Sequence, residues 1–142
     1  MKRFSFPLDR VLDWKTVVAQ QEQSNLETLE RERAGIQSSL LSLDENIRGL
    51  SHSSPEPVSG HELACAAHAR AALVRRKTQV EAHHESCKGQ IVHQQQRLRT
   101  AETERRLFGK LRDKSHTEWS ADLTRQLDSD ASDLFLGGWN RR

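Results

Sequence analysis

Apolar residues recur in alternating steps of three and four positions over two long stretches of the chain. Steps of this kind place side chains in a narrow seam along one side of an α-helix, at the a and d positions of a heptad repeat. The first stretch predicts a long helix over about residues 7–50 that packs against a second helix. Its seam positions are Leu8, Leu12, Lys15, Ala19, Glu22, Leu26, Leu29, Arg33, Ile36, Leu40, Leu43, Ile47 and Leu50.

A serine-rich break with Pro55 and Pro57 follows the first stretch, and proline cannot continue a helix. We therefore expect a loop over residues 51–58. Ser59 and Glu62 have the spacing of a capping box, in which each side chain bonds to the backbone N–H of the other residue. This motif predicts where the second helix starts.

The second helix is expected over about residues 59–136, because no proline interrupts it before Gly137 and Gly138. Residues 137–142 are then a short tail. The heptad seam continues as far as Ala101, after which the apolar positions drift. Its positions are Leu63, Ala66, Arg70, Leu73, Lys77, Val80, His84, Cys87, Ile91, Gln94, Leu98 and Ala101.

A short loop between two long helices predicts an antiparallel hairpin. The expected fold class is thus all-α: two long helices in an antiparallel coiled coil, the second longer than the first, with residues 1–142 as a single domain. If residues 50 and 59 face each other, residue i lies opposite about residue 109 − i, so that Leu29 lies beside Val80. At 1.5 Å per residue, roughly 50 Å of the second helix extends beyond the first.

This overhang is rich in apolar residues, and the start of the first helix carries a second apolar stripe with Phe4, Val11 and Trp14. A surface of this size seldom stays in water, so we expect it to meet a partner protein, a second copy or a folded-back segment. The apolar residues of the overhang are Leu107, Phe108, Leu111, Trp119, Leu123, Leu127, Leu134, Phe135 and Leu136.

The composition favours thin, solvated helices over a globular core. Of the 142 residues, 35% are hydrophobic and 30% are charged, whereas average domains are about 45–50% apolar. No apolar run approaches the roughly 18 residues of a membrane span, and charged residues interrupt any signal peptide, so we expect a cytosolic protein without direct membrane insertion. Cys65 and Cys87 would lie about 33 Å apart on one helix, which predicts free thiols.

Residues suited to catalysis are scarce, so we expect no enzyme, no catalytic residue and no cofactor. Gly109-Lys110 does not form a phosphate-binding loop, because Glu104 stands where the first glycine would be. His83 and Cys87 share a helical face, as zinc ligands can, but the first helix offers no His or Cys to complete the set. We therefore expect no metal site.

Charge is distributed in two bands along the second helix. Residues 70–112 contain eleven basic residues against four glutamates, a net charge of +7, and residues 113–133 have a net charge of −4. A basic helix can bind nucleic acid, yet no aromatic residue stands between positions 70 and 107 to stack on bases. A nucleic-acid-binding hairpin and a self-associating scaffold remain alternatives to docking on a protein partner.

Three segments resemble the FliJ family of flagellar export proteins: residues 4–14 (FSFPLDRVLDW), residues 101–114 (AETERRLFGKLRDK) and residues 130–136 (DASDLFL). The length and the two-helix layout agree over essentially the whole chain. The most specific part is the N-terminal Phe-x-Phe-Pro-Leu pattern combined with the Arg-Arg-x-x-x-Lys-Leu cluster. Whether a flagellar system or a related injectisome is served stays open.

The resemblance implies a coiled coil similar to the central stalk of rotary ATPases, inserted by its terminal end into the hexameric export ATPase. It further implies that the stalk promotes ring assembly, couples to the cytoplasmic part of the export gate at the inner membrane, and in some members binds export chaperones. The implied ring contacts are Phe6, Leu8, Val11, Trp14, Leu107, Phe108, Leu111, Leu123 and Leu127, with Arg105, Arg106, Lys110 and Arg112 facing acidic loops. The implied gate contacts are Leu41, His68 and Ala72.

Overall fold

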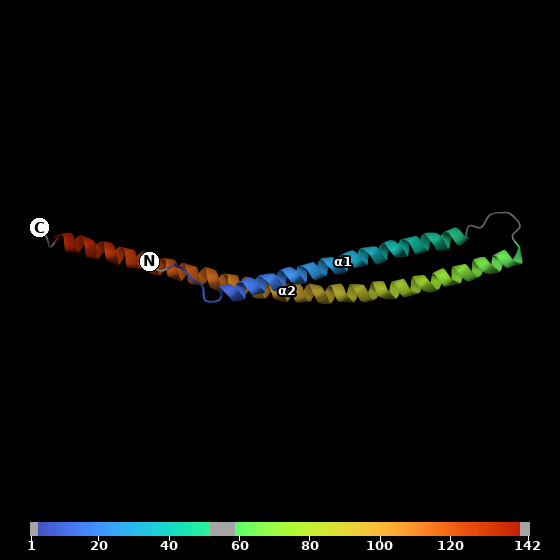
Figure 1. The fold of residues 1–142 in the computed structure, drawn as a ribbon, viewed down its shortest axis with the longest axis horizontal. Coiled ribbons are helices and arrows are strands. Elements are labelled where there is room, and N and C mark those ends of the chain that lie inside the picture. Colours follow the sequence, from blue (N-terminus) through green and yellow to red (C-terminus); the bar gives the residue numbers. More distant parts are fainter. Residues whose placement is uncertain (1–2, 52–58, 140–142) are drawn as a thin grey trace. The chain divides into compact units, whose positions relative to one another are not determined.

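Two α-helices make up the regular structure of the computed structural model, which describes residues 3–51 and 59–139. They are α1 (Asp9–Ser51) and α2 (Gly60–Trp139), and no strand occurs in the described ranges (Figure 1). Stretches of α1 pack antiparallel along stretches of α2, which confirms the all-α hairpin with a longer second helix. Most of the expected loop, residues 52–58, and residues 140–142 of the expected tail lie outside the described residues.

The start of α1 lies two residues later than the sequence predicts. Pro7 and Leu8 form a turn in which the Asp9 N–H donates to the Phe6 carbonyl oxygen over 3.1 Å. Proline has no N–H to donate, so it fits this position before the first helical hydrogen bonds. Asp9 then occupies the first helical turn, where a negative charge is favourable.

The predicted capping box at the start of α2 is confirmed. The Glu62 N–H donates to Ser59 Oγ over 3.3 Å, and the Ser59 N–H donates to Glu62 Oε2 over 2.9 Å. These bonds hold the pKa of the Glu62 carboxyl below its usual value, with the backbone bond from Ser59 as the main cause. Two N–H groups that the helix itself cannot satisfy are thus satisfied reciprocally.

The end of α2 differs from the prediction, because the helix runs through Gly137 and Gly138 to Trp139. Glycine costs about 1 kcal/mol relative to alanine inside a helix but keeps its N–H, so it weakens a helix without breaking it. A glycine cap needs a left-handed backbone conformation, and no glycine in the described residues adopts one.

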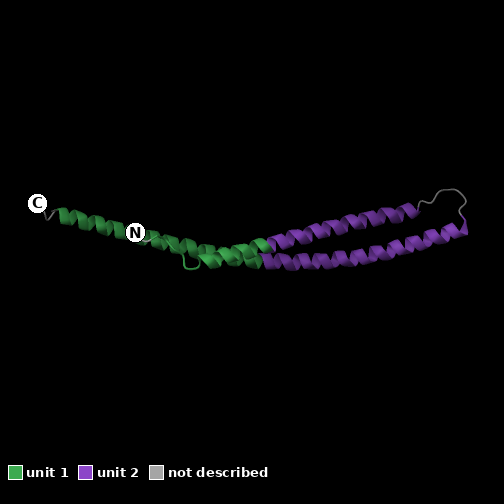
Figure 2. Ribbon diagram, viewed as in Figure 1, with its two compact units in different colours: residues 1–21, 99–142 green, residues 22–98 purple. Residues whose placement is uncertain are grey.

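The chain divides into two compact units, and each unit takes one stretch from each helix (Figure 2). Unit 1 consists of Met1–Gln21 and Arg99–Arg142, and unit 2 is Glu22–Leu98. The single domain expected over residues 1–142 stays a prediction.

The core of unit 2 is the predicted seam. Leu26, Cys87 and Ile91 are buried in it, and further seam residues pack against them. Charged seam positions behave differently, since Arg33 and Arg70 are exposed. The partly buried residues that pack against this core are Leu29, Ile36 and Leu98.

The register of unit 2 differs from the predicted alignment by one heptad. Cys87 Sγ lies 3.6 Å from the carbonyl oxygen of Leu29, whose expected neighbour was Val80. His83 Nε2 lies 3.1 Å from Glu32 Oε1. The predicted alignment places Lys77 opposite Glu32, six positions before His83. A displacement of seven residues returns the same heptad positions to the interface, so the apolar pattern alone fits both alignments.

A buried polar contact distinguishes the two alignments. Glu22 and Gln94 are both seam residues with less than a tenth of their surface exposed. Gln94 Nε2 donates to a carboxylate oxygen of Glu22 and, over 3.0 Å, to the Glu22 carbonyl oxygen. Arg97 Nη2 donates to the other carboxylate oxygen over 2.8 Å. In the predicted register Glu22 would face Cys87, which cannot replace these bonds.

Replacing Glu22 by glutamine tests this contact through its pH dependence. The hydrogen bond from Gln94 and the charge of Arg97 lower the pKa of Glu22 below 4.5, although burial acts against them. The ionised carboxylate therefore stabilises the folded state above that value, and this contribution is lost as the pH falls through the lower folded-state pKa. We expect wild type to melt above Glu22→Gln near neutral pH and the difference in melting temperature to shrink as the pH falls below 4.5. Melting followed by circular dichroism checks this, and a difference independent of pH contradicts it.

Candidate partner-binding surfaces

The N-terminal segment of unit 1 lies along α2. Phe6 is 6% exposed, and the Phe4 ring lies with its centroid 4.9 Å from that of His116 in an edge-on geometry. The Phe4 centroid is also 5.7 Å from that of Trp119. Arg112 Nε lies 3.4 Å from Asp9 Oδ1. The segment therefore covers part of the α2 surface that the sequence predicts to be unpaired.

This coverage shortens the predicted overhang. The sequence predicts that the overhang starts just after Ala101, but Phe4 reaches Trp119, and Trp119 and Leu123 are both partly buried. Every residue from position 124 to position 138 is exposed, a length of roughly 22 Å. The exposed stretch still contains large apolar side chains, namely Leu127 at 45%, Leu134 at 78%, Phe135 at 69% and Leu136 at 63%.

All of the predicted ring-contact residues belong to unit 1, but the structure divides them between two sides of α2. Phe108 is partly buried on the side that faces α1, and Arg112 on the same side pairs with Asp9. Leu107 and Leu111 are 57% and 41% exposed, and they lie roughly 100° and 60° around the helix from Phe108. The apolar candidates thus do not gather in one cluster. Among the N-terminal candidates, Phe6 is buried, Val11 is partly buried, and Leu8 and Trp14 are 39% and 59% exposed.

The basic candidates are exposed and only partly engaged in ion pairs. Arg106 Nη2 lies 3.6 Å from Glu102, four residues earlier on the helix. Arg105 and Lys110 are exposed. Exposed pairs of this kind contribute little to stability, so these side chains are available to a partner.

Lys15 forms two contacts that its position in the seam does not predict. Its Nζ lies 2.5 Å from Glu104 Oε2 and 4.8 Å from the ring centroid of Trp14. The aliphatic part of a lysine packs well against apolar neighbours while its charge reaches a carboxylate. Glu104 lies ten positions beyond Gln94, which the predicted alignment places opposite Lys15, so this ion pair could not be found from the sequence.

The predicted gate-contact residues belong to unit 2, and all three are exposed. Leu41 is 62% exposed on α1, and His68 and Ala72 lie one turn apart on α2. None of them lines the open groove that unit 2 does contain between its two helices. Their role in binding a partner stays a prediction.

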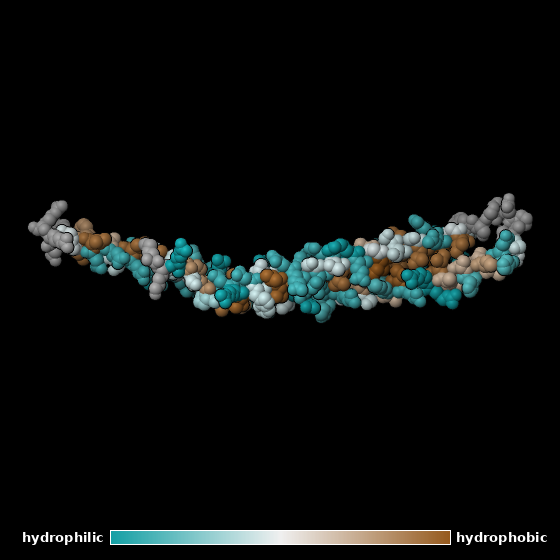
Figure 3. Space-filling view, in the orientation of Figure 1, coloured by the Kyte–Doolittle hydropathy of each residue, from teal (hydrophilic) through white to brown (hydrophobic). Residues whose placement is uncertain are grey.

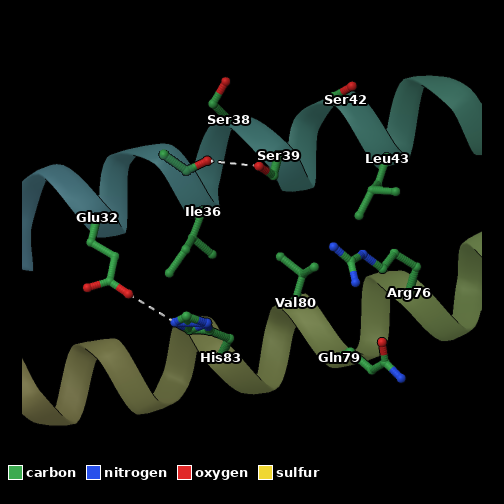
Figure 4. Close-up of a pocket in the computed structure, with 11 residues that line it drawn as sticks. Glu32, Ile36, Ser38, Ser39, Ser42, Leu43, Arg76, Gln79, Val80 and His83 are labelled. Carbon is green, nitrogen blue, oxygen red and sulfur yellow. Dashed lines mark hydrogen bonds and ion pairs between the residues drawn. The ribbon is translucent and has the colours of Figure 1, made fainter.

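The groove of unit 2 has a volume of about 820 Å³ (Figure 4). Ile36 and Leu43 on α1 point toward Val80 on α2, and the ion pair of Glu32 with His83 lies at one end. Small residues leave room on the α1 side, where Gly35, Ser38, Ser39 and Ser42 contribute to the lining.

The candidate metal ligands are used in other ways. His83 bonds to Glu32, and Cys87 is 2% exposed in the core of unit 2. Within residues 3–51 and 59–139, no three His, Cys, Asp or Glu side chains gather where they could hold a metal ion. Both cysteines are free thiols, with Cys65 exposed, as the sequence predicts.

The two thiols should differ sharply in reactivity. With a maleimide reagent at neutral pH, we expect Cys65 to be modified at once and Cys87 only after the hairpin opens, because a buried thiol is inaccessible to the reagent. Intact-mass measurement should show one adduct in native buffer and two in denaturant. Two rapid adducts on the native protein would contradict the packing of unit 2.

The contacts of Phe4 predict a measurable effect on the start of α1. Phe4→Ala removes both ring contacts, so we expect backbone amides of residues 3–12 to exchange about tenfold faster with deuterium. Leu127→Ala, a truncation in the exposed part of unit 1, serves as the control and should leave this exchange unchanged. Equal exchange in wild type and Phe4→Ala would show that the segment is held without Phe4.

The basic stretch of α2 is substantially neutralised within the chain. Of its eleven basic residues, five form ion pairs, with partners on α1 or on α2 itself. Each such pair reduces the charge available to phosphates. The five are Lys77, Lys88, Arg97, Arg106 and Arg112.

The fold and its exposed side chains indicate a class of protein. The described residues form a two-helix coiled-coil hairpin with large apolar and basic side chains exposed on its helices. A scan against models of known families matches residues 4–130 to the flagellar FliJ protein family. Because the match covers most of the chain, the chain belongs to the FliJ family, and it is a helical protein associated with flagellar protein export.

Two further comparisons, with curated proteins and with solved structures, found no match. No helix in the described part of the chain has an apolar run long enough to cross a membrane.

Proposed function

We propose that this protein is a non-enzymatic stalk and adaptor of the flagellar export ATPase. Unit 1 inserts into the central opening of the hexameric ATPase and promotes assembly of the ring. Unit 2 contacts the cytoplasmic domain of the export gate and, in this way, couples ATP hydrolysis to protein export. The protein then acts in the cytoplasm and at the cytoplasmic face of the inner membrane, and export chaperones are further candidate partners.

One observation carries the proposal: the exposed end of unit 1. All side chains of residues 124–138 are exposed, including four large apolar ones. Apolar surface of this kind is rarely left uncovered unless it binds something. A single helix can enter a narrow opening, and membership of the FliJ family supplies the export apparatus as the setting.

The basic side chains of unit 1 support the proposal through their charge. Lys110 follows Leu107 by three residues and therefore borders the outward side of α2 that carries Leu107 and Leu111, whereas Arg105 is exposed on another side of the helix. An apolar pair with a positive charge beside it suits a partner surface with apolar residues and acidic loops. We assign this outward side to the wall of the ring and the exposed gate candidates of unit 2 to the gate.

Leu107→Gln tests the ring contact. We expect this change to weaken binding to the hexameric export ATPase about tenfold and to reduce stimulation of its activity, because the apolar contact that Leu107 makes with the ring is lost. Leu63→Gln is the matched control: Leu63 is also on α2 and is 56% exposed, against 57% for Leu107, but it belongs to unit 2. Titration with a steady-state ATPase assay measures both.

Absence of both binding and stimulation by wild type at micromolar concentration would overturn the proposal. The nucleic-acid alternative predicts instead a binding that falls steeply with salt concentration. Sedimentation of the chain alone distinguishes the self-associating scaffold, which requires a dimer at tens of micromolar.

A further inference from the structure

The last part of α2, from the partly buried Leu123 onward, has one apolar side with acidic edges. Leu123, Leu127, Ala131, Leu134 and Phe135 follow one another at intervals of four, four, three and one residue. Residues at such spacings share one side of a helix. We call these five residues the tip face, and Figure 3 shows apolar side chains at this end of α2.

Two aspartates border the tip face. Asp128 directly follows Leu127, and Asp130 directly precedes Ala131, which places their carboxylates along its two long edges at 100° per residue. The other two aspartates of the stretch, Asp122 and Asp133, lie toward the opposite side of the helix. Asp122 is already engaged there, because its Oδ1 lies 2.9 Å from Arg125 Nη2.

The acidic edges decide between the possible occupants of the tip face. Residues 120–139 contain four aspartates and one arginine, while the two arginines that end the sequence lie outside the described residues. In a pair of identical tip faces, Asp128 and Asp130 of one copy would approach those of the other, and like charges brought together disfavour that pairing. A partner surface whose apolar residues are bordered by lysine or arginine would complement both the apolar side chains and the negative charge of the tip face.

We propose that the tip face docks into an apolar groove with basic edges in the innermost part of the export ATPase opening. This inference rests on the proposed function and adds the chemistry of a second contact. Residues 105–112 carry positive charge and meet acidic partner loops, and the tip face carries negative charge and meets basic ones. Two bands of opposite sign along one helix then fix how deep and in which direction the helix enters.

Matched charge variants of the full-length protein test the proposal. Asp128→Asn with Asp130→Asn removes the two edge charges, and Asp122→Asn with Asp133→Asn removes the same charge from the other side. We expect the edge variant to bind the export ATPase about tenfold more weakly at low salt and with a weaker salt dependence. The control variant should stay within about twofold of wild type.

A matched pair of leucine variants tests the apolar part. Leu127→Gln should weaken binding about tenfold, whereas Leu136→Gln should not, because Leu136 lies away from the tip face although it is 63% exposed. Circular dichroism of each variant verifies that the helices persist.

The outcomes separate the two proposals. If wild type binds and Leu107→Gln weakens the complex, but the edge variant and Leu127→Gln bind as wild type does, the tip-face inference is overturned and the proposed function stands. Equal losses for the edge and control variants also overturn the inference, since they indicate a general charge effect. No binding by wild type overturns both, and a dimer that Leu127→Gln dissociates identifies a second copy as the occupant.

Discussion

The buried hydrogen bonds between Glu22 and Gln94 are the constraint on which the alignment of the hairpin in unit 2 depends. An apolar heptad seam holds two helices together but repeats every seven residues, so alignments one heptad apart bury almost the same side chains. A polar pair satisfied in one alignment and unsatisfied in the next makes the difference, because an unpaired buried carboxylate or amide is costly. Arg97 completes the arrangement by binding the second carboxylate oxygen.

The narrow seam also explains why so much apolar surface remains outside it. In unit 1 the buried apolar residues are few, with Phe6, Ala19 and Ala101 below a tenth exposed. Two helices in contact bury only the residues between them, so an apolar residue on any other side needs another partner. Phe4 supplies one for Trp119, and the residues beyond Leu123 have their large side chains exposed.

The function proposed above depends on exposed surfaces of the two helices. In that proposal a few exposed leucines supply the docking energy and charge sets the direction of docking, since charge complementarity guides association and rejects wrong partners. The ion pair of Arg112 with Asp9 reduces the positive charge of residues 105–112, and an acidic band lies near the tip face. A helix with two bands of opposite charge would bind its partner in one preferred orientation.

The sequence alone determined the two helices, the capping box at Ser59 and the seam, because helix periodicity and capping are local properties of neighbouring residues. It could not determine the register, since a pattern that repeats every seven residues is unchanged by a shift of seven. The burial of Phe6, the contacts of Phe4 and the true extent of exposed α2 depend on how the N-terminal segment of unit 1 lies along α2. Only the tertiary structure decided them, because they arise between residues about a hundred positions apart that no local rule connects.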